Sequence, residues 1–112
     1  MPKGEEAAAE RFYCGLLGFE RRAKPDHLEK RGGCWFDSNG VELHLGVDPE
    51  FVAARKAHPA FVVSDLARLK ARLEAANIEI VWDTQLADFD RFYASDPFGN
   101  RLEFMQQRAH KT

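Results

Sequence analysis

Four side chains in this sequence have the types and spacing that a small catalytic or metal site needs: Glu42, His44, His58 and Glu103. Each falls in or at the start of a run whose alternating pattern predicts a β-strand, and alternate residues of a strand share a face. Glu42 and His44 therefore lie on one face of their strand. One imidazole and two carboxylates, each fixed on a strand, form a set suited to a divalent metal, and we expect His58, Glu42 and Glu103 to be its ligands.

Each of these residues also has a simpler interpretation. His58 could be a polar residue at a strand start, and Glu103, which follows a tight turn, could face solvent. Glu42 could be an ordinary exposed hairpin residue. For His44 we favour a hydrogen-bonding role on a half-buried face over a place in a pocket or a ligand role.

Aromatic and cationic side chains offer a second kind of site. Trp35, Phe92 and Tyr93 are most simply core residues, but Trp35 and Tyr93 are also candidates to line a ligand pocket. Arg91 and Arg55 are candidates to meet an anionic substrate, although exposed cations are common.

The elements that position these residues repeat along the chain. Apolar spacing, strand-forming runs and turn residues predict a helix, three strands, a connector over 48–56, and then a strand, a helix and three strands. Asn39-Gly40, between two apolar runs, indicates a β-hairpin. Asp65 is placed to cap the second helix, and Gly18 to end the first. The predicted helices cover 5–17 and 66–76, and the predicted strands cover 19–23, 33–37, 41–45, 58–63, 78–82, 89–95 and 102–106.

The two halves of the chain align with each other. A spacing of 61 residues pairs Asn39 with Asn100 and Glu42 with Glu103, and a nearby spacing of 59 pairs residues 18–20 with 77–79, which together indicate an internal duplication. The same spacing places the counterpart of His58 before Met1, so we expect the first half to lack its initial strand. Three explanations stay open: metal use was lost, an N-terminal segment is missing, or a partner chain completes the site.

The bulk composition is that of a compact globular protein. The 112 residues are 45% hydrophobic and 30% charged, with a net charge of −2. No long basic cluster indicates nucleic-acid binding, and no apolar run is long enough to span a bilayer. We expect a cytoplasmic protein with neither nucleic acid nor membrane as a partner. Cys14 and Cys34 form no CxxC pair and are interpreted as reduced core residues.

Three runs in this order resemble a known family: AERFYCGLLGFE at 9–20, HPAFVVSDL at 58–66 and YASDPFGNRLEF at 93–104. They are similar to the helix-to-strand signature, the metal-ligand strand and the closing turn of vicinal-oxygen-chelate proteins, the glyoxalase, bleomycin-resistance and dioxygenase superfamily. The resemblance covers residues 5 to 106.

The resemblance implies an α+β fold of two βαβββ modules around a cup-shaped cavity. We expect a single domain over 1–112, with an N-terminal αβββ module over 1–48 and a C-terminal βαβββ module over 57–107. By position, His58 matches the ligand on the first strand of the second module. Glu103 and Glu42 match the ligands on the last strands of the second and first modules.

Two functions follow from the resemblance. The first is a lyase, isomerase or dioxygenase-like enzyme that uses Zn, Ni, Fe or Mn on a small oxygenated substrate. The metal would chelate neighbouring substrate oxygens while Glu42 or Glu103 carries a proton. The second is a metal-free module that binds a small molecule such as an antibiotic, with Trp35, His44, Arg91 and Tyr93 in its pocket. A third possibility is that the protein is an inactive, truncated copy of a member of this family. An unpaired sheet edge would favour a homodimer.

Overall fold

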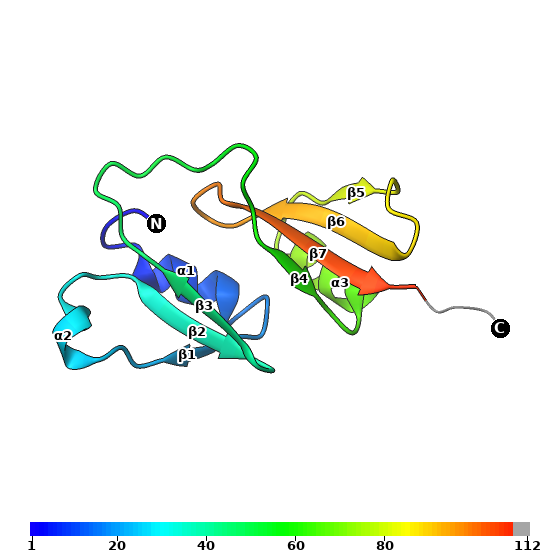
Figure 1. Ribbon diagram of the computed structural model, residues 1–112. Coiled ribbons are helices and arrows are strands. Elements are labelled where there is room, and N and C mark those ends of the chain that lie inside the picture. The colour runs from blue at the N-terminus through cyan, green and yellow to red at the C-terminus, as the bar shows by residue number, and fades with distance from the viewer. Residues whose placement is uncertain (109–112) are drawn as a thin grey trace. The chain divides into compact units, whose positions relative to one another are not determined.

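The computed structural model describes residues 1–108 and forms two compact units, Met1–Val52 and Ala53–Thr112, each described here by itself (Figure 1). Among the described residues, no helix has the length and apolar character needed to cross a membrane. The single-domain organisation and the module limits at 48 and 57 stay predictions.

The first unit is a three-stranded antiparallel sheet with a helix on one face. Its strands follow the order β1-β2-β3. Its elements are α1 (Glu6–Tyr13), β1 (Glu20–Arg22), α2 (Asp26–Glu29), β2 (Cys34–Ser38) and β3 (Val41–Leu45).

Helix α1 is shorter than the predicted 5–17 because regular helix ends at Tyr13 and the chain continues in turns. Gly18 then adopts φ +83°, and the N–H of Phe19 donates to the Tyr13 carbonyl at 2.9 Å. This is the glycine-capped helix end that the sequence predicts. The Tyr13 ring stacks on Phe36 of β2 at 5.4 Å, so α1 and the sheet form one core.

The β2–β3 hairpin turns at Asn39 and Gly40, as predicted. Both residues have positive φ, 49° and 84°, which is the conformation of the two-residue turn that Asn-Gly favours. Trp35 therefore pairs with His44, and Asp37 with Glu42.

The second unit is a four-stranded sheet in the order β4-β7-β6-β5, with β4 parallel to β7. Figure 1 shows α3 lying along one face of this sheet. Its elements are β4 (Ala60–Val62), α3 (Leu66–Ala75), β5 (Val81–Asp83), β6 (Phe89–Ser95) and β7 (Arg101–Gln107). Strand β4 begins after Pro59, so His58 lies two residues before the strand and, contrary to the prediction from the sequence, is not part of it.

The core of the second unit lies between α3 and the sheet. Asp65 caps α3 by accepting a hydrogen bond from the Arg68 N–H at 3.0 Å. Spacing of three and four residues then turns three leucines toward the sheet. The side chains buried in the second unit include Leu66, Leu69, Leu73, Phe92, Leu102 and Phe104.

The two units share one strand pattern, since β1-β2-β3 and β5-β6-β7 are both antiparallel in the same order. Within residues 1–108, the first unit has no strand that corresponds to β4. The predicted fold class, α+β with an αβββ module followed by a βαβββ module, is therefore confirmed.

Candidate functional site

The second unit carries a polar surface on the sheet face opposite α3. Strand register places Tyr93 opposite Glu103, and Asp83 opposite Arg91. Because side chains alternate, these four residues share one face while Phe92 and Phe104 point into the core. This polar face therefore carries Asp83, Arg91, Tyr93 and Glu103, and His58 lies beside it.

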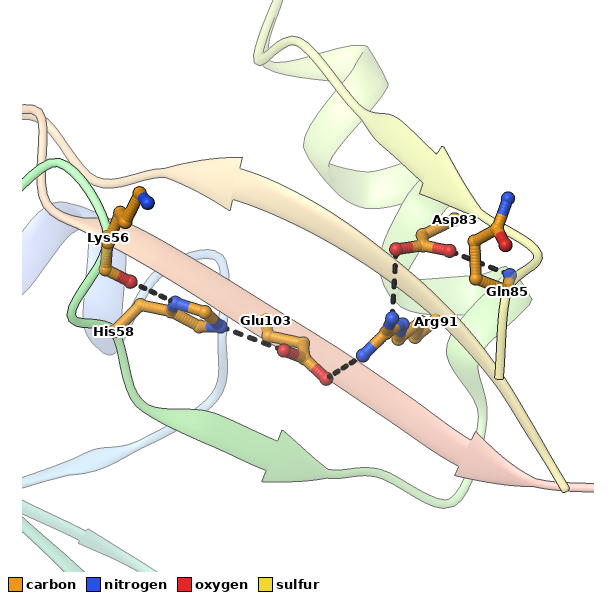
Figure 2. Close-up of polar contacts among 6 residues, drawn as sticks. All are labelled: Lys56, His58, Asp83, Gln85, Arg91 and Glu103. Carbon is orange, nitrogen blue, oxygen red and sulfur yellow. Dashed lines mark hydrogen bonds and ion pairs between the residues drawn. The ribbon is translucent and has the colours of Figure 1, made fainter. Parts of the chain in front are cut away.

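Four of these side chains form a continuous chain of hydrogen bonds (Figure 2). His58 Nε2 lies 2.8 Å from Glu103 Oε1, and Arg91 donates to Glu103 Oε2 at 3.3 Å. Arg91 also donates to Asp83 Oδ2 at 2.9 Å. Both Glu103 oxygens thus have partners, and the residue is only 5% exposed. Glu103 does not face solvent.

The second ring nitrogen of His58 determines its protonation pattern. Nδ1 lies 2.6 Å from the carbonyl oxygen of Lys56, which can only accept, so Nδ1 carries a proton. Nε2 then presents its lone pair to a carboxylate, which also accepts. The 2.8 Å contact is then made either by a second proton that Nε2 donates to Oε1 or by a metal ion that contacts both atoms.

Arg91 is a fixed positive charge in this chain. Burial works to lower its pKa, but the hydrogen bond to Glu103 and the charge of Asp83 outweigh that effect and raise the pKa. Arg91 Nε is buried and has no hydrogen-bond partner within residues 1–108. The guanidinium therefore stays charged beside Glu103 at every pH at which the protein would be studied.

Tyr93 links the histidine to a second arginine. Its ring meets the His58 ring edge-on at 5.5 Å, and the guanidinium of Arg101 lies over it at 4.1 Å. Tyr93 is partly exposed, in contrast to its neighbour Phe92, which is fully buried. Of the aromatic candidates, Phe92 is therefore a core residue.

The first unit has its own polar surface, built on β1, β2 and β3. His44 stacks face to face on Trp35, with ring centroids 3.9 Å apart. Arg22 Nε donates to Asp37 Oδ2 at 2.6 Å. These residues and Glu42 line a pocket of about 270 Å³. His44 is exposed and stacked on an aromatic ring, which differs from the half-buried role we favoured.

The structure therefore brings the predicted site residues together in two groups. His58, Arg91, Tyr93 and Glu103 share the second unit, and Trp35, Glu42 and His44 share the first. That residues 42, 58 and 103 are neighbours stays a prediction.

Several residues of these surfaces were not singled out from the sequence. The sequence signal that could have found them is their alternating position in a strand, which holds for Asp83, Arg101, Arg22 and Asp37. No sequence signal could have found the Lys56 carbonyl, because a backbone acceptor in a connector has no sequence pattern.

Two side chains of the second unit fit a divalent metal. His58 Nε2 and Glu103 Oε1 are donors of the right type, and their separation of 2.8 Å lets one small ion contact both. A histidine ligand commonly donates its other N–H to a backbone carbonyl, as His58 does to Lys56. Within residues 1–108, however, no three His, Cys, Asp or Glu side chains cluster closely enough to hold a metal. The pair is part of a ligand set and needs at least one further donor.

An αβββ unit followed by a βαβββ unit, with a histidine beside a buried carboxylate of the second sheet, is the architecture expected of the class that the three sequence runs resemble. The chain matches the family model of the Glyoxalase/Bleomycin resistance protein/Dioxygenase superfamily over residues 4–104. It belongs to this superfamily.

Solved structures agree with this assignment. A glyoxalase family protein from Bacillus anthracis is 45% identical, with a TM-score of 0.93, over 96% of this chain and 88% of that one. Two more distant structures share the fold. Lactoylglutathione lyase from Agrobacterium tumefaciens is 23% identical, with a TM-score of 0.71, over 95% of this chain and 88% of that one. An antibiotic binding protein from a Streptomyces species is 19% identical, with a TM-score of 0.72, over 96% and 91%. A search of curated proteins found no match.

Proposed function

We propose that this protein is a divalent-metal-dependent lyase, isomerase or dioxygenase-like enzyme that acts on a small oxygenated molecule. One observation carries the proposal: His58 donates Nδ1–H to the Lys56 carbonyl and directs Nε2 at Glu103 Oε1. The two atoms are close enough either to share a proton or to contact one metal ion, and both are of the types that bind divalent metals.

His58 and Glu103 would hold the metal, and Glu42 is the proposed third ligand from the first unit. A metal bound there, which we expect to be Zn, Ni, Fe or Mn, would polarise neighbouring oxygens of the substrate. The protein's own groups do the rest. Arg91 fixes Glu103 Oε2, and Tyr93 forms a wall beside the imidazole. Glu103 or Glu42 is the candidate to accept or return a proton at the substrate carbon.

Metal analysis of gently purified protein tests this proposal. We expect stoichiometric uptake of one of these metals, with uptake lost in His58→Ala and Glu103→Gln. His27→Ala and Glu29→Gln are matched controls, because both residues are exposed in α2. If the protein takes up no Zn, Ni, Mn, Fe or Mg, and both site variants still bind a ligand unchanged, the enzyme proposal is wrong.

A specific contact favours a second function, metal-free binding of a small molecule. The Arg91 guanidinium already provides a cation for Glu103 Oε2 at 3.3 Å, and its charge opposes a second cation nearby. A solved structure with the same fold is described as an antibiotic binding protein. Tight binding of a planar antibiotic by chelator-treated protein would select this function.

We also propose that the protein is a homodimer. Strand β7 has neighbours on both sides, β4 and β6, whereas β3 pairs only with β2 among the described residues. A half-exposed edge strand is a surface that proteins usually cover. Light scattering after size-exclusion chromatography tests this, and a strict monomer at high concentration would contradict it.

A further inference from the structure

A pocket in the second unit joins two arginines, one aromatic ring and an apolar wall. Its volume is about 780 Å³, which is within the range of small-molecule sites. Arg55, Arg101 and Tyr93 line it together with Ile78, Val81 and Glu79. Tyr93 also contacts the His58 ring, so the pocket adjoins the proposed metal pair.

The guanidinium of Arg101 is held in place and still able to bind an anion. It lies 4.1 Å from the centre of the Tyr93 ring, and a cation over an aromatic face is attracted to it. Such stacking leaves the N–H groups at the edge of the guanidinium plane free to donate. Within residues 1–108, neither Arg101 nor Arg55 forms an ion pair with a carboxylate. A planar fork of N–H donors matches a carboxylate in two hydrogen bonds.

The rest of the lining gives the ligand an apolar part and limits its charge. Val81 is 52% exposed, and it is joined by Ile78 and two alanines of the segment before His58. Glu79 is the one acidic residue of the lining, so the charged side chains sum to a single positive charge. One net positive charge suits a singly charged carboxylate better than a doubly charged phosphate.

We infer that this pocket binds the carboxylate of a small acid with an apolar body, and that Arg101 is the residue that recognises it. The substrate class is therefore an aliphatic or aryl carboxylic acid whose remaining oxygens lie toward His58 and Glu103. As a statement about substrate this rests on the proposed function, but carboxylate binding itself can be measured without metal.

Calorimetric titration of chelator-treated protein tests the inference, with phenylacetate as the probe. Phenylacetamide has the same shape without the charge, and phenyl phosphate carries more charge. We expect phenylacetate to bind about tenfold more tightly than either, the effect of one good charged contact. Arg101→Gln should abolish the difference between acid and amide, and Arg101→Lys should retain part of it, because it keeps the charge but loses the planar fork.

Arg68→Gln is the matched control, since Arg68 is an exposed arginine on α3 and the charge change is the same. It should leave the preference for the acid intact. Equal binding of acid and amide by the wild-type protein, or an unchanged preference in Arg101→Gln, overturns the inference. The two proposals fail separately. If the protein takes up no metal but prefers the acid in a way that depends on Arg101, the carboxylate pocket is supported and the enzyme proposal is not. If the protein takes up metal in a way that depends on His58 but shows no preference for the acid, the metal site is supported and the carboxylate pocket is not.

Discussion

Glu42 and Glu103 each stand on the last strand of their sheet, opposite a residue of the strand before it. Glu42 of β3 lies opposite Asp37 of β2, and Glu103 of β7 lies opposite Tyr93 of β6. The two positions differ in surroundings, since Glu103 is buried between His58 and Arg91 whereas Glu42 is exposed. Both units therefore place a carboxylate on their last strand, but with different neighbouring side chains.

This equivalence gives a first prediction for the proposed third ligand. Glu42→Gln should lower metal affinity by about tenfold or more if Glu42 completes the ligand set, because an amide is a weaker metal ligand than a carboxylate. Metal titration measures the change. Glu20→Gln, on the exposed strand β1, is the control and should have no effect. Unchanged affinity in Glu42→Gln would remove Glu42 from the proposed site.

Arg91→Gln should raise metal affinity at the His58–Glu103 pair. The substitution removes a positive charge 3.3 Å from Glu103 Oε2, which we expect to be worth about tenfold in binding of a divalent ion. The melting temperature of the metal-free protein should fall, because Glu103 and Asp83 both lose a partner. Arg108→Gln removes an exposed arginine from its pair with Asp90 and should leave metal affinity unchanged. A loss of metal in Arg91→Gln would contradict the charge argument.

Asp96 should matter more to stability than its place in a turn suggests. It is 5% exposed, and its carboxylate accepts hydrogen bonds from the Phe98 N–H, the Asn100 N–H and the Asn100 side chain at 2.8–2.9 Å. Asp96→Ala should cost about 2–3 kcal/mol in the free energy of unfolding.

Asp90→Ala is the comparison for Asp96, because it removes a carboxylate of the same unit whose ion pair with Arg108 is exposed. Its cost should be below about 1 kcal/mol. Urea unfolding followed by circular dichroism measures both variants. Equal costs would mean that the buried hydrogen bonds of Asp96 do not stabilise the turn.

Gly33→Ala should destabilise the first unit far more than Gly40→Ala. Both glycines have positive φ, 86° and 84°, which costs any other residue about 1–2 kcal/mol. A Cβ at Gly33 would also lie 2.1 Å from the Leu45 carbonyl oxygen in β3, whereas at Gly40 nothing lies within 4 Å. We expect Gly40→Ala to fold and Gly33→Ala to lose β2–β3 pairing, as seen by amide hydrogen exchange. Similar protection in both variants would contradict this.

The two thiols should react slowly in the folded protein. Burial raises the pKa of both Cys14 and Cys34 above 9.0, with Glu10 as the next cause for Cys14. Less thiolate is then available near neutral pH, and Cys34 is also fully buried. We expect iodoacetamide to label Cys14 first, with a rate that keeps rising past pH 9.

The same shift affects stability. A thiol pKa that is higher in the folded protein than in the unfolded chain adds stability below the unfolded pKa, and that contribution is lost as pH rises through the folded pKa. The fold should therefore weaken at alkaline pH, and Cys34→Ala should reduce that pH dependence. Rapid labelling of Cys34 at neutral pH would show that the first unit opens.

The sequence by itself determined the local structure and the family. The Asn39-Gly40 turn, the strands over 41–45 and 89–95 and the leucine face of α3 were all predicted, because each depends on the dihedral preferences and periodicity of adjacent residues. The three motif runs identified the superfamily. The candidate residues His58 and Glu103 followed from those runs by position.

Only the tertiary structure decided what surrounds these residues. Arg91 joins Glu103 to Asp83 because the register of β5, β6 and β7 places them on one sheet face, and the residue pattern within a single strand does not fix its register with its neighbours. The Lys56 carbonyl that holds the His58 ring is a backbone group, and its direction depends on the path of the connector. The residue types follow from the sequence, but the pairing of the strands decides which side chains meet.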